Sequence, residues 1–303
     1  MTIRSTRRGA ISIIGAGILT TVGCLGRERD PEEQLDDAAD ELSSYSDVST
    51  ALEDGYEMSF PYVSDDNGVL GMPFINHGVD ELDADVPNIL WYNLAGDGTF
   101  ELIGAKWYVP HDEGDEPPSL FGENFEGPMA GETDDIPEHY GLNVWLFEDN
   151  SAGMFAASHA DVEPPSYLDS LLSVWETVTP YFSNEELAFD DGYVDNEECF
   201  GNDDGDYGIP LVNPDRAGLD IDEPGVLMYR FGSNWSYRLQ GVEWFVSTDD
   251  ASDAPELFDQ TFHEPMEGHT PDFPDGEHYG LHAWLFTANP DGIFSLFTPR
   301  EIC

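Results

Sequence analysis

The hydrophobic and polar positions along the chain predict one helix followed by several strands, and this order occurs twice. In residues 38–52, apolar side chains recur at spacings of three, and Gly55 stands beyond them as a stop signal. Residues 167–189 have a similar helical pattern that Pro180 interrupts. Turn signals separate the expected strands, so residues 90–109 should form a β-hairpin. The strand candidates of the first half are residues 72–75, 89–93, 100–109 and 140–147.

The second half of the chain repeats the first at a nearly constant offset. Identical positions lie 137 residues apart over most of each half, as for Gly55 and Gly192. After Gly131 the offset becomes 139, and the letters EHYGL at 138–142 recur at 277–281. A constant offset over about 100 residues, with one short insertion, predicts a tandem duplication of a domain of about 120 residues, a common domain size.

These patterns predict an α+β fold built from two tandem copies of a small domain. Each copy should have one N-terminal helix followed by an antiparallel β-sheet. Each should also have a long loop rich in proline and glycine, which is residues 110–137 in the first copy. The predicted boundaries place an export signal at 1–23, an acidic tether at 24–40, the first repeat domain at 41–163 and the second at 166–303.

The first 24 residues have the pattern of an export signal. Basic residues that include Arg7 and Arg8 precede an apolar run of about 14 residues, which is shorter than the roughly 20 needed for a spanning helix. Adjacent arginines are typical of a twin-arginine signal, which delivers folded proteins. Small residues precede Cys24, as in a lipobox, so Cys24 is expected to carry a lipid. The alternative is an ordinary secretion signal with a chance cysteine.

The charge of the chain is extremely one-sided. The sequence has 10 basic and 63 acidic residues, a net charge of −53, and loss of the three leader arginines would make it −56. Such charge destabilises a compact state at low salt, whereas at molar salt the Debye length falls to about 3 Å. An aromatic content of 13% argues against disorder. We therefore expect a folded protein of an extreme halophile, held outside the cytoplasm at the outer face of the membrane.

The repeated EHYGL segment carries the strongest candidate chemistry. In the second copy the expected donors for a divalent metal are Glu243, His269, His278 and His282. The matching positions in the first copy are Lys106, Glu132, His139 and Asn143. Because a lysine repels a cation, at most the second copy should bind metal. His278 and His282 lie about 13 Å apart along a strand, so sharing one ion would need a bulge at Gly280. The alternative is a structural role, in which these histidines anchor the long loop by hydrogen bonds.

Other candidate residues are expected to be structural or located at the surface. If Cys24 is lipidated, Cys199 and Cys303 remain as an even pair, and a disulfide outside the cytoplasm would stabilise the fold by about 4–5 kcal/mol. Two unpaired buried cysteines are the alternative. Asn234 begins an acceptor sequence for N-glycosylation. The histidines with no histidine at the matching position are expected at the surface, and they are His77, His111, His159 and His263.

Several segments of the second copy carry a resemblance to known proteins. They are GIPLVNP from Gly208, HYGLHAWL from His278, NPDGIF from Asn289 and PREIC, which ends at Cys303. The copy resembles a family of exported, mostly single-domain bacterial and archaeal proteins of uncharacterised function. The family's cysteines coincide with Cys199 and Cys303, which implies that they pair. The family has a histidine where this chain has Pro210, and Pro73 in the first copy. If that histidine is functional in relatives, its loss here favours a binding or structural module over an enzyme.

The sequence therefore favours a non-enzymatic, lipid-anchored surface protein that binds a ligand or an envelope protein. Two alternatives stay open: a metal-dependent enzyme with its site in the second copy, and a structural lipoprotein that assembles as a homo-oligomer. The expected partners are the membrane, through the lipid on Cys24, and an unidentified ligand or protein. Nucleic acid is excluded because no basic patch exists. A binding role requires a concave pocket of about 300 Å³ or more. Apart from the metal, no cofactor is expected.

Overall fold

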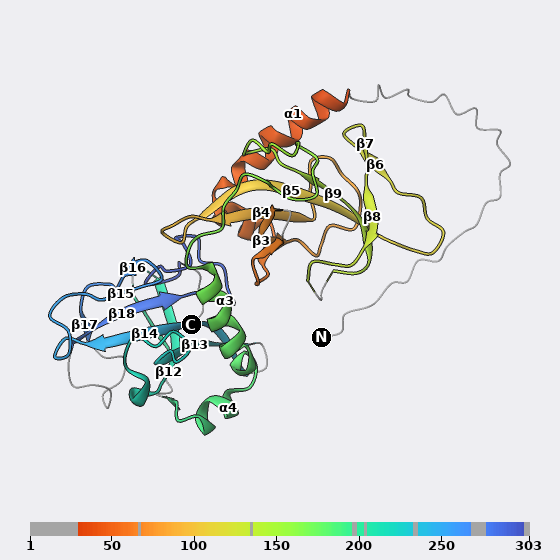
Figure 1. The fold of residues 1–303 in the computed structure, drawn as a ribbon. Coiled ribbons are helices and arrows are strands. Elements are labelled where there is room, and N and C mark those ends of the chain that lie inside the picture. Colours follow the sequence, from red (N-terminus) through yellow and green to blue (C-terminus); the bar gives the residue numbers. More distant parts are fainter. Residues whose placement is uncertain are drawn as a thin grey trace, which may run out of the picture.

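The chain folds into two β-sheets with few helices. The computed structural model describes residues 30–65, 68–133, 136–195, 199–202, 205–232, 236–267 and 277–299. Figure 1 shows the two sheets as separate bodies, each accompanied by its own helices. The strand pairs are antiparallel, which confirms the expected α+β class. In the ranges given above, no helix is long and apolar enough to span a bilayer.

The N-terminal unit, residues 30–163, begins with helices and continues as a sheet. Its helices are α1 (Pro31–Leu42), the 3₁₀ helix η1 (Ser43–Ser46) and α2 (Val48–Glu53). Its strands are β1 (Glu57–Met58), β2 (Val63–Asp65), β3 (Gly68–Ile75), β4 (Ile89–Leu94), β5 (Phe100–Pro110), β8 (Glu126–Met129) and β9 (His139–Val144). They are ordered β1-β3-β4-β5-β9-β8, with β2 beside β3. The separate pair β6 (Ser119–Leu120) and β7 (Glu123–Asn124) lies in the long loop.

The C-terminal unit, residues 166–299, has the same order of elements. Its helices are α3 (Leu168–Val178), η2 (Thr179–Tyr181), α4 (Glu185–Asp190) and η3 (Pro214–Arg216). Its strands are β10 (Val194–Asp195), β11 (Phe200–Asn202), β12 (Gly205–Val212), β13 (Val226–Phe231), β14 (Tyr237–Ser247), β17 (Met266–Glu267) and β18 (Glu277–Ala283). The order β10-β12-β13-β14-β18-β17, with β11 beside β12, matches that of the N-terminal sheet. The pair β15 (Glu256–Leu257) and β16 (Gln260–Thr261) again lies in a loop.

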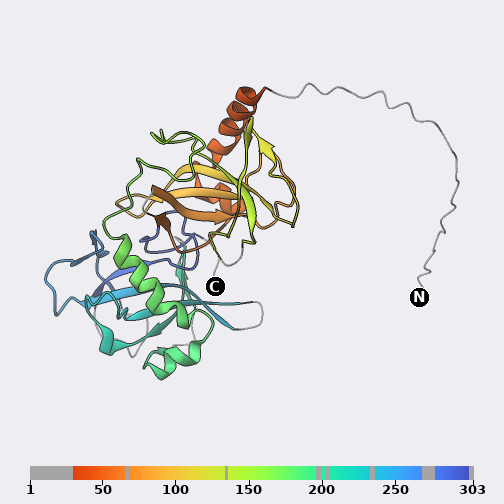
Figure 2. The same ribbon diagram turned by 45° about the vertical axis from the view of Figure 1, so that its right-hand side comes forward.

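Both faces of each sheet are apolar, and the helices cover one of them. Leu42 of α1 and Leu171 of α3 belong to a core that also contains side chains of both sheets. Figure 2 shows α3 crossing the strands of the C-terminal sheet. On the other face each unit has its own cluster, around Trp91 and around Trp284. Since successive strand residues point to opposite faces, Leu90 belongs to the helix side and Trp91 to the far side.

The structure corrects three predicted boundaries. Helix α1 begins at Pro31, inside the segment 24–40 predicted to be a tether, because Asp30 caps the helix and proline suits its first turn. The N-terminal unit therefore starts before the predicted residue 41. The helix predicted over 38–52 is divided into α1, η1 and α2. The strand predicted over 140–147 ends at Val144, where the chain enters a loop.

The two units meet at the turn between β4 and β5. The backbone N–H of Ile293 donates to the carbonyl oxygen of Gly98 at 2.8 Å. The Tyr167 hydroxyl donates to the carbonyl oxygen of Ala95 at 2.7 Å, and its ring packs on Phe294 with centroids 5.1 Å apart. A Cβ at Gly98 would lie 2.6 Å from a ring carbon of Phe294. Only glycine therefore permits this close approach between the units.

Candidate functional site

A buried carboxylate lies near the centre of the C-terminal sheet, on the face away from α3. Glu243 of β14 is 0% exposed and lies directly opposite His282 of β18. The hydroxyl of Tyr207, from β12, donates a hydrogen bond to Oε2 of Glu243. Burial raises the pKa of Tyr207 well above its usual value, and the neighbouring carboxylate adds to this shift. Tyr207 therefore stays a protonated hydrogen-bond donor to Glu243.

Two fully buried histidines flank this carboxylate. Nε2 of His278 lies 3.5 Å from Oε1 of Glu243, and Nε2 of His282 lies 3.8 Å from Oε2. The register between β14 and β18 is continuous from His278 to Ala283, so the bulge at Gly280 that sharing one ion would need is not present there. Instead, a Cβ at Gly280 would lie 2.3 Å from Oε1. The glycine thus makes room for the carboxylate between the two imidazoles.

His263, which the sequence pattern places at the surface, lies beside this cluster. Its ring centroid is 5.7 Å from that of His282, and its Nε2 donates to the backbone oxygen of Phe294 at 3.1 Å. Burial lowers the pKa of His263, while the Phe294 carbonyl and Glu243 act in the opposite direction. No repeat signal marks this residue, because the position 137 residues earlier is Glu126. Only the folded structure brings it to the cluster.

The matching positions of the N-terminal unit hold an ion pair. Lys106 of β5 is the only lysine of the chain, is 1% exposed, and pairs with Glu132. A Cβ at Gly141 would lie 2.5 Å from Cε of Lys106, so this glycine makes room for the lysine as Gly280 does for the carboxylate. A small cavity of about 120 Å³ lies against the pair and Asn143. The same place in the two sheets therefore holds a lysine in one and a glutamate in the other.

The surroundings of the ion pair favour a neutral histidine. Burial lowers the pKa of His139, and the charge of Lys106 adds to the effect. Nδ1 of His139 donates to the carbonyl oxygen of Pro137 at 2.9 Å, and its Nε2 lies 3.9 Å from Oε2 of Glu132. Burial also lowers the pKa of Lys106, against the opposing attraction of Glu132. The N-terminal cluster thus contains its own cation, the ammonium group of Lys106, so the charge of Glu132 does not need a second cation to balance it.

The structure describes three of the four predicted metal ligands. Glu243, His278 and His282 come together, while His269 lies outside the described residues. Within the described part of the chain, no group of three or more His, Cys, Asp or Glu side chains is arranged so that it could hold a metal ion. One carboxylate and two imidazoles are nevertheless donors typical of sites for zinc and related metals.

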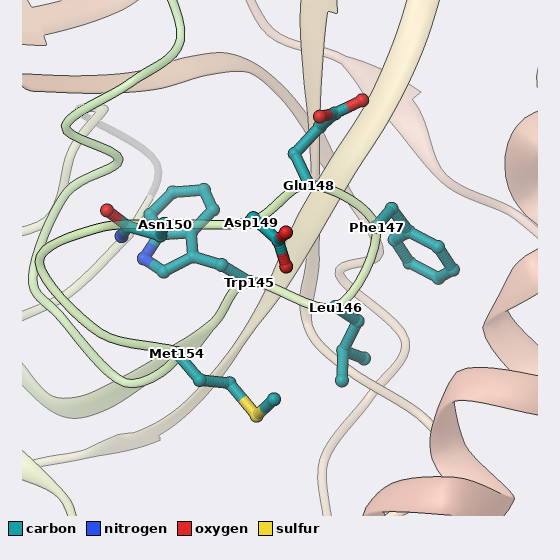
Figure 3. Close-up of a pocket in the computed structure, with 7 residues that line it drawn as sticks. All are labelled: Trp145, Leu146, Phe147, Glu148, Asp149, Asn150 and Met154. Carbon is teal, nitrogen blue, oxygen red and sulfur yellow. The ribbon is translucent and has the colours of Figure 1, made fainter.

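A separate pocket of about 430 Å³ lies on the N-terminal unit, in the loop after β9 (Figure 3). The backbone N–H of Trp145 donates to the oxygen of Met154 at 2.9 Å and closes this loop. The Asn150 side chain donates to the oxygen of Ser158 at 3.0 Å and accepts from the N–H of Ala160 at 3.1 Å. These bonds hold the loop open in a fixed shape. The lining residues are Trp145, Leu146, Phe147, Glu148, Asp149, Asn150 and Met154.

The matching loop of the C-terminal unit is closed by the same kind of backbone hydrogen bond, but the β4–β5 turn of the N-terminal unit covers it. Its first N–H donates to the oxygen of Ile293 at 2.8 Å. Ile293 is 0% exposed where the β4–β5 turn meets it, whereas the matching Met154 is 45% exposed. A Cβ at Gly292 would lie 3.1 Å from the oxygen of Gly98, while one at the matching Gly153 meets nothing within 4 Å. One loop is therefore an internal interface, and the other is open.

The remaining predicted sites fall mostly outside the described residues. This is so for Arg7, Arg8, Cys24, Asn234, His269 and Cys303. Cys199 is disulfide-bonded, but both other cysteines lie outside the described ranges, so its pairing with Cys303 stays a prediction. Thr298 pairs with Asp206 of β12, which brings the C-terminal segment close to the β11–β12 pair beside Cys199.

Comparisons with known proteins found no relative of this chain. No protein family matches the chain, and neither a curated protein nor a solved structure matches it. The resemblance to a family of exported proteins therefore stays a prediction, and function has to be argued from the site itself.

Proposed function

We propose that the chain is an exported, lipid-anchored surface protein of an extreme halophile that binds an envelope protein through its open loop. The difference between the two matched loops carries this proposal: one is covered by a β-turn, and the other has a pocket of about 430 Å³. In this view the two units are tandem copies of one domain, which the constant sequence offset and the common strand order support. The pocket exceeds the roughly 300 Å³ typical of binding sites.

The covered loop indicates what kind of group the open loop would accept. On the C-terminal unit, Ile293 donates its N–H to the carbonyl oxygen of Gly98, within a tight turn whose glycine allows close contact. Met154 is the match of Ile293, so its loop would accept a similar glycine-containing β-turn. Such a turn presents a rigid backbone carbonyl and little side-chain volume.

Charge beside the open loop favours a basic partner. Glu148 and Asp149 line the pocket, whereas the matching residues of the covered loop are the uncharged Thr287 and Ala288. Carboxylates at the edge of an interface attract a partner with the opposite charge and repel one with the same charge. A second copy of this acidic chain is therefore a poor occupant, which argues for a different protein rather than for self-assembly.

The burial of the three described metal-ligand candidates also favours a binding protein over an enzyme. Glu243, His278 and His282 are all fully buried. Catalytic groups have to reach a substrate within hydrogen-bond distance, and these three side chains have no solvent-exposed surface from which to do so. Three parts of the proposal rest on the sequence alone: the export signal, the lipid on Cys24 and the saline environment.

Site-specific crosslinking in cells would test the partner. A photoreactive amino acid replaces Met154 in the full chain, expressed in a halophilic host, and the crosslinked peptide is identified by mass spectrometry. The control position is Leu219, which has the same exposed fraction of 45%. We expect position 154 to link to one envelope protein, at a peptide that contains glycine in a turn, and position 219 to give no such product. Equal labelling from both positions, or a link from Met154 to a second copy of the chain, would contradict the proposal.

A further inference from the structure

We propose that the N-terminal unit binds small uncharged aldehydes covalently, as an iminium adduct on Nζ of Lys106, in the cavity of about 120 Å³ beside its buried ion pair. The lining residues of this cavity differ from those of the open loop. Aldehyde binding therefore goes beyond the proposed partner binding and is tested separately from it.

The amine that would react is unusual in this chain. Lys106 is the only lysine in a sequence with 63 acidic residues, and it is 1% exposed on the inner strand β5. Burying an ammonium group has a desolvation cost that a paired carboxylate often offsets only in part. An apolar residue of similar volume would avoid this cost. An amine at this place is therefore explained better by the chemistry of its nitrogen than by stability.

The cavity lies at the nitrogen end of the lysine. Nζ pairs with Glu132 and lies 3.7 Å from Sδ of Met129, and all three side chains line the cavity. Gly141 lines it as well, and a Cβ there would lie 3.1 Å from Nζ. The lining also includes Glu126 and Ala157, which are exposed, so a small molecule can enter from the surface.

The lining selects a short, uncharged molecule. A volume of about 120 Å³ corresponds to about four water molecules at ~30 Å³ each, which suits a carbonyl compound with few heavy atoms. Glu126 and Glu132 repel a compound that carries a carboxylate, so keto acids and similar anions are poor ligands. The apolar part of the wall suits an alkyl chain and consists of Leu70, Met129, Leu142 and Phe155.

Glu132 can take the proton that keeps the amine unreactive. Burial lowers the pKa of Lys106, because desolvation disfavours the ammonium group, while Glu132 acts in the opposite direction. Nδ1 of the neutral His139 donates to Pro137, so its Nε2 is an acceptor, and this atom lies 3.9 Å from Oε2 of Glu132. Among the described residues neither atom has a hydrogen-bond partner. A proton on Glu132 would meet this acceptor, which favours the neutral amine.

The reaction balances without a further reagent. Glu132 accepts one proton from Nζ, and the nitrogen lone pair forms a bond to the carbonyl carbon while the C=O π electrons move to the oxygen. A second proton moves from the nitrogen to that oxygen and gives a carbinolamine. The hydroxyl group then leaves as water with the proton from Glu132, and the nitrogen lone pair forms the C=N bond. The iminium ion has the same charge as the ammonium group, so the buried ion pair persists.

Reductive trapping measures this reaction at a single site. The full chain in molar NaCl is treated with acetaldehyde and cyanoborohydride at neutral pH, and peptide mass spectrometry separates ethylated Lys106 from the N-terminal amine. We expect ethylation of Lys106 to be at least about tenfold faster in the folded chain than in guanidinium chloride, because each unit by which burial lowers the pKa raises the neutral fraction tenfold. Glyoxylate, a small aldehyde with a carboxylate, should label only the unfolded chain.

Two truncations test whether the cavity holds the aldehyde. Phe155→Ala enlarges the cavity and should let hexanal, whose chain is too long for the wild-type cavity, label Lys106. Met154→Ala truncates the neighbouring side chain, which lines the open loop and not this cavity, and should leave hexanal excluded. Lys106→Arg retains the cation and should give no product at this position.

The outcomes separate a reactive amine from a purely structural ion pair. A structural pair is protected by burial, so labelling of Lys106 only after unfolding would overturn the proposal. Equal labelling of the folded wild-type chain by acetaldehyde, glyoxylate and hexanal would indicate an ordinary accessible amine and would overturn it as well. Near-ultraviolet circular dichroism reports whether Phe155→Ala is folded, and if it is not, these comparisons on the wild-type chain decide.

Discussion

Replacing Gly98 with alanine tests whether the β4–β5 turn holds the two units together. Gly98 has φ of +83°, a backbone conformation that costs a non-glycine residue about 1–2 kcal/mol. The added Cβ would also lie 2.6 Å from Cδ2 of Phe294 and 2.9 Å from Cγ2 of Ile293. Overpacking of this kind typically costs about 1–3 kcal/mol. We therefore expect Gly98→Ala to lower the free energy of unfolding by about 2–5 kcal/mol.

Two other glycines separate the two contributions to this cost. A Cβ at Gly96, in the same turn, meets nothing within 4 Å, so Gly96→Ala should leave stability almost unchanged. Gly153 has φ of +115° and also has nothing within 4 Å, so Gly153→Ala measures backbone strain without a clash. The difference between Gly98→Ala and Gly153→Ala then isolates the contact between the units, about 1–3 kcal/mol.

Urea denaturation in molar NaCl, followed by tryptophan fluorescence, measures the three variants under one condition. If Gly98→Ala is no more destabilising than Gly153→Ala, the turn does not hold the units together. The covered loop would then give no information about the occupant of the open loop.

Three further perturbations test the electrostatics of the chain. Lys106→Met should lower the free energy of unfolding by about 3–5 kcal/mol in urea denaturation, because Glu132 would lose its buried partner, and the double variant Lys106→Met/Glu132→Gln should recover most of the loss. Burial raises the pKa of Tyr56 and Tyr92, so their contribution is complete below about pH 10 and should be lost above it, by up to ~1.4 kcal/mol per pH unit for each tyrosine; denaturation at pH 9 to 11 checks this. Lowering NaCl from molar to about 0.1 M lengthens the Debye length to about 10 Å and should lower the Tm measured by circular dichroism, whereas an unchanged Tm would contradict the halophilic interpretation.

The fold could be predicted where local pattern decides it. The apolar runs and the turn signals at 95–98 were enough to place the β4–β5 hairpin. The start of α1 was missed because only Ala38 and Leu42 of this acidic helix are buried, so its composition is that of a solvated tether. Its N-cap and proline, Asp30 and Pro31, were the available signal.

The site could be predicted in its residue types but not in its geometry. The repeated EHYGL segment pointed to His278 and His282, and the strand expected to contain Trp244 pointed to Glu243. How these side chains approach one another depends on the register of β14 with β18 and on the space at Gly280, which no local pattern contains.

The open loop could not have been distinguished from the covered one by its sequence. Both units have the same Asn, Gly and Phe spacing, at Asn150 and at Asn289. Which loop is covered depends on how the two units pack, because the turn around Gly98 meets the C-terminal loop. Long-range contacts of this kind leave no periodic pattern in the chain.

Cell fractionation of the wild-type chain and of Cys24→Ser tests the central claim of an exported, lipid-anchored protein most directly. Both are expressed in a halophilic host, and the membrane, cytoplasmic and medium fractions are compared by immunoblot, with protease added to intact cells. The wild-type chain is expected in the membrane fraction and open to the external protease, and Cys24→Ser in the medium. A wild-type chain that remains in the cytoplasm with its leader uncut would contradict the account.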